Sequence, residues 1–270
     1  MTLSIIIVSY NTRAVLEQCL ESLDEASVAL PHDIVVVDNG SSDGSAAAVR
    51  ARWPYVRVLE QGQNTGFAAA TNVGIRATRG DLVLLLNSDT RVPSGALDAL
   101  AGRLLAHPDA AAAGPRLVDT EGRTELSFGP MIGPFAEAGQ KILRALYARG
   151  AGPVTRWVEH ATDRERFVDW VSGACLLVRR ADADAVGLLD ERFFLYTEDV
   201  DFCAALRARG RRILFTPRAQ VTHLRGRSRV AEPAVMNAAY RRSQLAFYEK
   251  HHPRWAPLLR AYLRLKGIRF

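Results

Sequence analysis

Two runs of apolar residues in this chain each end in side chains that carry oxygen ligands. The stretch "LVLLLNSDT" has an unbroken apolar run from Leu82 to Leu86, typical of a strand buried on both faces, followed by Asn87, Ser88 and Asp89. "DIVVVD" ends in the same way, in Asp38. The oxygens of Asn87, Ser88 and Asp89 suit a hard cation, Mg²⁺ or Mn²⁺, and the alternative for Asp89 is a helix cap. For Asp38 the alternative to a role in a site is an Asx-type turn.

The densest acidic cluster is "YTEDVDFC", which contains Glu198, Asp199 and Asp201. Acids in the first turn of a helix complement its dipole, and Thr197 is a candidate N-cap, so a structural role is one interpretation. The flanking residues are apolar, however, which places these carboxylates at the rim of a core. Burial raises a carboxyl pKa and makes the group a better general base near neutral pH, which is the functional interpretation.

His223 follows a strand-like stretch in "VTHLRGRS". A lone histidine at a strand end is usually a hydrogen-bonded polar residue without a further role. A neutral imidazole can also complete the coordination sphere of a metal ion begun by Asp89. The sequence leaves both roles open.

The elements that would position these residues alternate between strand and helix in the first half of the chain. Buried strands alternating with amphipathic helices indicate a parallel sheet with helices on both faces. Ligands of such sheets bind beyond the carboxyl ends of the strands, so Asp38 and Asp89 are expected to face one crevice. The predicted strands are 3–9, 33–38, 56–60 and 81–87, and the predicted helices are 13–24, 45–52 and 66–78.

The second half is less regular. Residues 119–166 are rich in glycine, proline and charge and are predicted to be a variable loop region with one helix near 136–148. The remaining predictions are strands at 110–118 and 167–180, strands in "RRILFTP" and "QVTHLRG", a short helix in "DADAVGLLDERF", a helix at 197–210, and helical structure at 234–268 interrupted at 251–255.

Composition limits the class of protein. The chain has 270 residues, a formal net charge of +6 and 48% hydrophobic residues, so a packed core and an anionic partner are expected. Its three cysteines form no CxxC pair, which favours a reducing cytoplasm, and no signal peptide or membrane-spanning segment is evident. Neither GxGxxG nor GxxxxGK[ST] occurs, which counts against a dinucleotide site and a Walker loop.

Several motifs together resemble family 2 glycosyltransferases of the GT-A fold, and most closely the rhamnosyltransferase-like group that builds bacterial cell-surface polysaccharides. They occur in the family's order between about residues 3 and 228: "SIIIVSYN", "VVVDNGSSDGS", "NTGFAAATNVGI", "GDLVLLLNSD", "VSGACLLVRR", "GLLDERFFLYTEDVDFCAALRARG" and "VTHLRGRS". The resemblance implies an α/β, Rossmann-like, mostly parallel central sheet. The expected domains are a glycosyltransferase domain at 1–228, with a nucleotide-binding half at 1–118 and an acceptor-side half at 119–228, and a C-terminal helical extension at 229–270.

The resemblance also implies roles for individual residues. Nucleotide-binding positions are Ser9, Tyr10, Asn11, Asp38, Asn64, Gly66, Phe67, Asn72, Asn87 and Ser88. Asp89 and His223 match the metal ligands for Mg²⁺ or Mn²⁺, and Asn87 replaces the first acid of the family's Asp-x-Asp motif, which removes one charge. Asp199 matches the catalytic base, with Glu198 as the next candidate. Trp170, Ser172 and Gly173 match the acceptor-side wall.

The implied reaction is a single in-line displacement that inverts the anomeric carbon. A divalent cation offsets charge on the leaving diphosphate, and one carboxylate takes the proton of the acceptor hydroxyl. The donor favoured by the subgroup is dTDP-rhamnose, with UDP- or GDP-sugars as alternatives; the acceptor is a glycan or lipid-linked glycan, and no nucleic acid is expected. Competing functions are a sugar-nucleotide pyrophosphorylase and a non-catalytic nucleotide-sugar-binding subunit.

The segment "RWAPLLRAYLRLKGIRF" at 254–270 combines basic residues with apolar positions at helical spacing and contains no acid. Such a helix can lie in a membrane interface, with its cations against anionic lipid headgroups. We therefore expect a cytoplasmic protein that associates peripherally with the inner face of the plasma membrane through this segment. The alternative is a helix that packs on the domain with a basic outer face.

Overall fold

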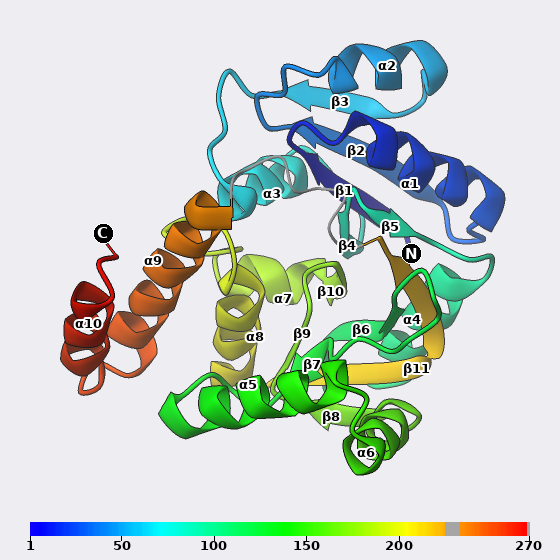
Figure 1. The fold of residues 1–270 in the computed structure, drawn as a ribbon. Coiled ribbons are helices and arrows are strands. Elements are labelled where there is room, and N and C mark those ends of the chain that lie inside the picture. Colours follow the sequence, from blue (N-terminus) through cyan, green and yellow to red (C-terminus); the bar gives the residue numbers. More distant parts are fainter. Residues whose placement is uncertain (225–232, 269–270) are drawn as a thin grey trace.

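The computed structural model describes residues 1–224 and 233–268 and is built around one large mixed sheet (Figure 1). Its strand order is β3-β2-β1-β4-β10-β6-β11-β5, with β8 paired to β11. The strands β3, β2, β1, β4, β6 and β11 share one direction, whereas β10, β5 and β8 oppose it. The prediction of a mostly parallel α/β sheet with helices on both faces is confirmed.

The elements of the first half agree with the alternation in the sequence. They are β1 (Leu3–Ser9), α1 (Arg13–Ala26), β2 (His32–Asp38), α2 (Ser45–Arg52), β3 (Arg57–Glu60), α3 (Phe67–Arg76), β4 (Leu82–Asn87), β5 (Thr90–Arg91), α4 (Ala96–Leu105) and β6 (Ala110–Val118). The short strand β5, which the sequence did not indicate, pairs with the end of β11 and so brings the chain just after β4 beside His223.

The second half departs further from the prediction. Its elements are β7 (Phe128–Gly129), α5 (Pro134–Ala148), α6 (Gly152–Thr162), β8 (Arg166–Val168), β9 (Trp170–Val171), β10 (Cys175–Arg179), α7 (Arg180–Ala185), α8 (Glu198–Ala208), β11 (Arg212–His223), α9 (Pro233–His251) and α10 (Ala256–Leu265). Three corrections follow. The loop region contains a second helix, α6; the strand expected at 167–180 is three short strands; and two expected strands are one, β11, whose register shifts between Thr216 and Gln220.

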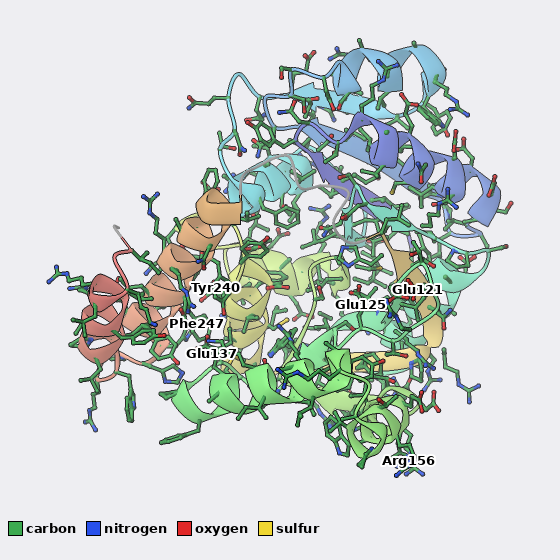
Figure 2. All side chains as sticks on the ribbon, viewed as in Figure 1. Glu121, Glu125, Glu137, Arg156, Tyr240 and Phe247 are labelled. Carbon is green, nitrogen blue, oxygen red and sulfur yellow. The ribbon has the colours of Figure 1, made fainter. Side chains whose placement is uncertain are left out.

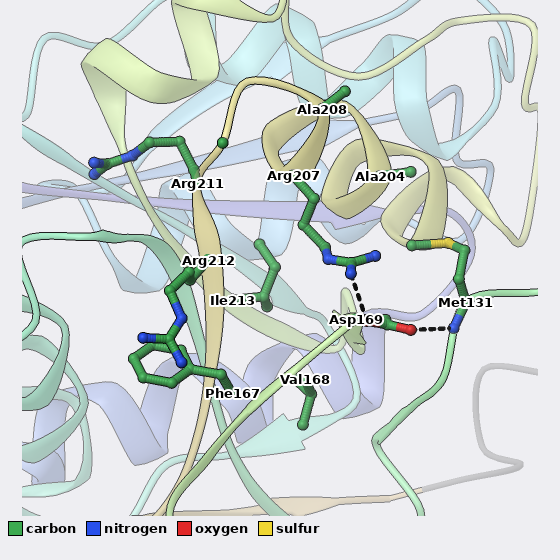
Figure 3. A pocket seen from close by; sticks show the side chains of 11 residues that line it. Met131, Phe167, Val168, Asp169, Ala204, Arg207, Ala208, Arg211, Arg212 and Ile213 are labelled. Carbon is green, nitrogen blue, oxygen red and sulfur yellow. Dashed lines mark hydrogen bonds and ion pairs between the residues drawn. The ribbon is translucent and has the colours of Figure 1, made fainter.

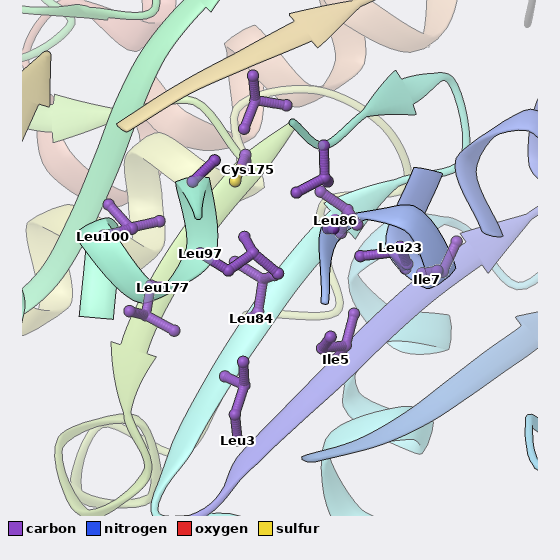
Figure 4. Packing of buried hydrophobic residues seen from close by; sticks show 14 of the residues in the cluster. Leu3, Ile5, Ile7, Leu23, Leu84, Leu86, Leu97, Leu100, Cys175 and Leu177 are labelled. Atoms are coloured by element: carbon purple, nitrogen blue, oxygen red, sulfur yellow. The ribbon is translucent and has the colours of Figure 1, made fainter. Parts of the chain in front are cut away.

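Two hydrophobic clusters fill the two faces of the sheet. One packs α1, α2 and α4 against alternate residues of β1, β2 and β4, and Figure 4 shows part of it around Leu84 and Leu86. The other packs α3, α7, α8 and α9 on the opposite face. All residues of Leu82–Leu86 are at most 1% exposed, so β4 is buried on both faces as its apolar run indicated. Each such leucine contributes roughly 1.5–3 kcal/mol through burial.

The C-terminal helices pack on the domain. Phe247 and Tyr248 of α9 belong to the second cluster, and Lys250 and His251 reach Asp201 of α8, with Nζ–Oδ2 and Nε2–Oδ1 distances of 2.8 and 2.6 Å. Within the described residues, no helix combines the length and apolar character needed to span a bilayer. The expected boundary between 228 and 229 lies outside the described residues.

Candidate active site at the carboxyl ends of the strands

The carboxyl ends of β1, β2 and β4 meet at one edge of the sheet. Ser9 pairs with Asp38, and Val8 pairs with Asn87 in the neighbouring strand. Buried Thr12 connects them: its hydroxyl lies 2.9 Å from the Ser9 hydroxyl and 3.0 Å from that of Ser88. Parallel strand pairing thus brings together polar residues from three separate motifs, as the sequence predicted. Thr12 itself carried no signal of this role.

Asp38 is 3% exposed, and among the described residues only one of its carboxylate oxygens has a hydrogen-bond partner. Its Oδ1 accepts a hydrogen bond from the Ser41 N–H at 2.7 Å, which is the turn interaction considered in the sequence. Its Oδ2 is buried and has no hydrogen-bond partner among the described residues. Buried carboxylate oxygens are nearly always hydrogen-bonded, so this atom is available to a ligand at the edge of the sheet.

Asn39, which the sequence analysis did not single out, fastens the segment 64–66 to the end of β2. Its side-chain amide donates to Asn64 Oδ1 at 2.9 Å and to the Gly66 carbonyl at 3.3 Å, and its Oδ1 accepts from the Thr65 N–H at 3.0 Å. Gly66 has φ +89°, and a Cβ there would lie 2.6 Å from the Phe194 carbonyl oxygen. Only glycine fits this close approach.

Asn72, Tyr10 and Asn11 differ in how accessible they are to a ligand. The Asn72 side chain is 1% exposed and bonds the Leu189 backbone and Glu191, so it holds the 189–191 segment instead of facing a ligand. Tyr10 is 40% exposed, and Asn11 borders a cavity of about 370 Å³ at the end of β1. Tyr10 and Asn11 are therefore accessible to a ligand at the sheet edge, whereas Asn72 is not.

Asp89 and His223 meet across the pairing of β5 with β11. Their Oδ1 and Nε2 atoms lie 3.3 Å apart, and the other ring nitrogen of His223 lies 3.1 Å from Glu125 Oε2 (Figure 2 labels Glu125). Burial lowers the pKa of His223, but the hydrogen bonds and charges of Asp89 and Glu125 outweigh it and raise the pKa to about 9. Glu125 lies in the predicted loop region, where no sequence pattern marked it.

These residues fit a divalent metal ion. A carboxylate oxygen and an imidazole nitrogen converge on one side of the site, and Glu125 orients the ring from the other side, an arrangement typical of metal-binding histidines. The described residues contain no group of three or more His, Cys, Asp or Glu side chains arranged around a metal position.

The backbone in front of α8 is strained. Tyr196 and Thr197 both adopt left-handed conformations, with φ +68° and +67°. Such residues are costly and often occur at functional sites. Thr197 occupies the N-cap position, but its hydroxyl donates to the Tyr196 carbonyl, so the expected side-chain cap does not form. The strained turn directs Glu198 and Asp199 into the protein.

Glu198 and Asp199 have different partners. Glu198 is 7% exposed and its Oε2 has no hydrogen-bond partner among the described residues; burial, and then the charge of Asp199, raise its pKa well above the ordinary value. Burial also raises the pKa of half-buried Asp199, although N–H groups of Gly173 and Val200, each at 2.8 Å, and the charge of Arg144 partly counter it. Arg144 lies on α5 and was not predicted.

The turn at 172–174 joins the two parts of the site. The Gly173 N–H binds Asp199, and the neighbouring Ala174 carbonyl accepts from the Asn87 N–H at 3.0 Å. A Cβ on Gly173 would lie 3.2 Å from that of Asp199, so glycine keeps the turn close to the carboxylate. The acidic start of α8 is thereby held against the end of β4. Trp170 is 6% exposed, and its indole N–H donates to the Pro130 carbonyl at 2.9 Å, so the indole is part of the core. Of the three residues predicted for the acceptor-side wall, Ser172 and Gly173 lie nearer the site.

Residues 4–153, more than half of the chain, match the family described as "Glycosyl transferase family 2". The chain belongs to glycosyltransferase family 2. It is 34% identical to the N-acetylglucosaminyl-diphospho-decaprenol L-rhamnosyltransferase of Mycobacterium tuberculosis (strain H37Rv) over 98% of this chain and 91% of that protein. It is 28% identical to the O-antigen biosynthesis protein RfbC of Myxococcus xanthus over 96% of this chain and 20% of that protein.

Solved structures confirm the GT-A type of fold for this family 2 glycosyltransferase. The mannosyltransferase PcManGT of Pyrobaculum calidifontis, in complex with GDP-Man and Mn²⁺, aligns with a TM-score of 0.61 at 18% identity, over 96% of this chain and 68% of that one. TarS of S. aureus, residues 1–349 with UDP, aligns with a TM-score of 0.60 at 16% identity, over 92% and 66%.

The glycosyltransferase also has a cavity of about 540 Å³ at the far end of α8 (Figure 3). Asp169 lies in its wall between Arg207, at 2.8 Å, and the Met131 N–H, also at 2.8 Å. None of the predicted site residues lines this cavity. The lining residues of α8 run from Ala204 to Ala208, five to nine residues after Asp199, so at about 1.5 Å per residue they lie roughly 8–14 Å along the helix from that acid.

Proposed function

We propose that this glycosyltransferase moves a sugar from a nucleoside diphosphate to a hydroxyl of a lipid-linked glycan, with inversion at the anomeric carbon, in cell-surface polysaccharide synthesis. The observation that carries the proposal is the turn at 172–174, which binds Asp199 through Gly173 and the end of β4 through Ala174. The same turn therefore holds both the candidate base, Asp199, and the candidate diphosphate site at the end of β4. Family membership removes the ground for the pyrophosphorylase alternative.

The donor would bind along the carboxyl edge of β1, β2 and β4. The buried oxygen of Asp38 would accept a hydrogen bond from the base or ribose, and Tyr10, Asn11 and the segment 64–67 would enclose the nucleoside. Asp89 and His223 would hold a divalent ion, which offsets charge on the leaving diphosphate when bound. The imidazole favours Mn²⁺ over Mg²⁺ as that ion, because imidazole suits transition metals better than magnesium.

The acceptor hydroxyl would lie beside Asp199. As its oxygen bonds to the anomeric carbon, the bond from that carbon to the phosphate oxygen breaks, and the hydroxyl proton passes to Asp199. Burial suits Asp199 to this task because its raised pKa increases its affinity for the proton. One base and one leaving group on opposite sides of the sugar lead to inversion.

The relative that matches nearly the full chain favours a rhamnosyl donor, dTDP-rhamnose, and a polyprenyl diphosphate-linked N-acetylglucosamine as acceptor. UDP- and GDP-sugars are the alternatives. We further propose that residues 1–118 bind the donor, that 119–228 face the acceptor, and that the protein works at the cytoplasmic face of the membrane. The three cysteines support the reducing compartment, since all are buried and free.

A transfer assay tests the proposal. Purified protein is incubated with Mn²⁺ or Mg²⁺, the acceptor, and dTDP-rhamnose, a UDP-sugar or a GDP-sugar in turn, and glycolipid product and nucleoside diphosphate are quantified together. Acceptor-dependent formation of both from one donor, with the opposite anomeric configuration in the product by NMR, is expected. Donor binding without product from any pair would instead support the non-catalytic subunit.

A further inference from the structure

The last helix presents two apolar faces. Ala256 and Leu263 are buried against the domain, whereas Leu258, Tyr262 and Leu265 are 62%, 48% and 89% exposed. The exposed residues follow Trp255, itself 43% exposed, at spacings of three, four and three, which places all four on one side of the helix. The inner face explains why α10 is attached to the protein, and the outer apolar face is left in contact with solvent.

Helix α5, far away in the sequence, has a similar exposed face. Phe135 is 82%, Ile142 62% and Leu146 37% exposed, and spacings of seven and four place them on one side of the helix. No residue of α5 is buried. Packing into the core therefore does not account for these apolar side chains.

The two faces adjoin. The rings of Phe135 and Trp255 are 6.1 Å apart at an interplanar angle of 80°. The start of α5 is also held to α9: Glu137 accepts hydrogen bonds from Tyr240 at 3.2 Å and Tyr248 at 3.1 Å (Figure 2). Figure 1 shows α5 and α10 at the periphery of the molecule, remote from β1 and β2. We name the exposed apolar residues of both helices the docking surface: Phe135, Ile142, Leu146, Trp255, Leu258, Tyr262 and Leu265.

The segments that carry the docking surface have more basic than acidic residues. On and next to α5 and α6 the basic residues are Lys141, Arg149 and Arg156, and on the α10 segment they are Arg254, Arg260, Arg264 and Lys266. Lys141 and Arg260 form ion pairs with Glu137 and Glu249. Residues 254–268 contain no acid. A second copy of this chain would bring like charges together, whereas anionic headgroups complement them. Exposed tryptophan and tyrosine beside leucine and cations are the composition that membrane interfaces select.

We propose that the docking surface, formed jointly by α5 and α10, binds the surface of an anionic phospholipid bilayer. Its apolar side chains enter the headgroup region, and lysines and arginines of the same segments contact lipid phosphates. The proposal extends the membrane segment expected at 254–270 to a second helix that is distant in sequence.

Vesicle co-sedimentation of the full chain tests the proposal. Vesicles of equal parts phosphatidylglycerol and phosphatidylcholine are compared with phosphatidylcholine alone at physiological salt. We expect binding to the anionic vesicles only, and a loss of at least about tenfold in affinity for each of two double variants, Leu258→Ser with Leu265→Ser on α10 and Phe135→Ser with Ile142→Ser on α5. Each replaces exposed apolar side chains without changing charge.

The matched control is Tyr55→Ser, which removes an aromatic residue 59% exposed between α2 and β3 and should bind like the wild type. Equal melting temperatures show that all variants are folded. Wild-type affinity of the α5 variant would show that α5 is not part of the membrane-binding surface. No binding of the unaltered chain to anionic vesicles would overturn the whole proposal. A wild-type dimer in sedimentation velocity that both double variants lose would assign the face to a second copy and overturn the proposal.

Transfer to a soluble acceptor analogue separates this proposal from the catalytic one. The double variants should keep the wild-type rate in that assay because their substitutions lie outside the proposed catalytic groups. If vesicle binding depends on both helices while transfer is absent from every protein, the docking surface stands and the proposed function fails.

Discussion

The proposed donor side and the proposed acceptor side of this glycosyltransferase are built differently. From β1 to β4, regular parallel strands end in a row of polar residues linked by short hydrogen bonds through Thr12 and Asn39. From 119 to 199, short strands, exposed helices and a strained turn hold Glu125, Gly173 and Asp199 in place. Regular pairing suffices to gather the proposed nucleotide site, whereas the candidate catalytic acids depend on contacts between segments far apart in the sequence.

The largest expected effect lies on the acceptor side. Asp199→Asn should lower kcat by about 10²–10⁴ and leave the dissociation constant of the nucleotide sugar, measured by calorimetry, within a few-fold of wild type, because a base acts only in the chemical step. Glu198→Gln is the matched comparison. If Asp199→Asn retains nearly full activity while Glu198→Gln loses it, Glu198 is the base and the assignment of the two acids is reversed.

The proposed metal ligands bridge the two sides, since Asp89 follows β4 and His223 ends β11. Asp89→Ala and His223→Ala should each abolish activation by low Mn²⁺ concentrations, and Glu125→Gln should raise the concentration for half-maximal activation about 10–100-fold, because it only orients the histidine. Activity is titrated against free Mn²⁺. Unchanged activity of the wild type in excess EDTA would show that no metal is needed and that the pair has another role.

A smaller effect is expected for the donor side alone. Asp38→Asn keeps the shape but replaces the unpartnered oxygen by an amide, so nucleotide-sugar affinity should fall about tenfold, the effect of one lost hydrogen bond to a charged group. The kcat at saturating donor should change little. Isothermal titration of donor and product nucleotide provides the measurement, with Asp43→Asn on the same edge as the control. A drop in kcat with unaltered affinity would place Asp38 in the chemical step instead.

The smallest effect concerns stability. Glu198 has a raised pKa in the folded protein, so folding favours its protonated form, and this contribution is present below its ordinary pKa of 4.5 and lost as pH rises toward the folded value. Above pH 7, Glu198→Gln should therefore raise Tm by about 2–4 °C for each kcal/mol that burying the Glu198 carboxylate costs the folded protein. Near pH 4 this gain should disappear. Scanning calorimetry at both pH values measures it. A destabilised variant at pH 8 would mean that the carboxylate is stabilised by a partner.

The candidate metal ligands, Asp89 and His223, and the acidic start of α8 stood out by residue type, but their supports did not. Glu125 lies in a stretch that indicated only a loop region, because irregular backbone has no periodicity to read. Arg144 lies on the one helix predicted there, and helical periodicity does not show that its charge reaches Asp199. Asn72 and Trp170 match the family's motifs, yet both bond to the protein's own backbone. A motif identifies a position, and only the packed neighbours show whether its polar atoms remain available.

The sequence by itself determined the alternating layers, the burial of β4 and the row of polar residues at the strand ends, because apolar periodicity and strand direction are local properties of the chain. Tertiary structure decided which carboxylates keep an unpartnered oxygen, which turn holds Asp199, and that α5 and α10 share one exposed face. Those outcomes depend on contacts between residues such as Phe135 and Trp255, separated by more than a hundred positions. No short-range pattern encodes such a contact, since its energy exists only once the chain has folded.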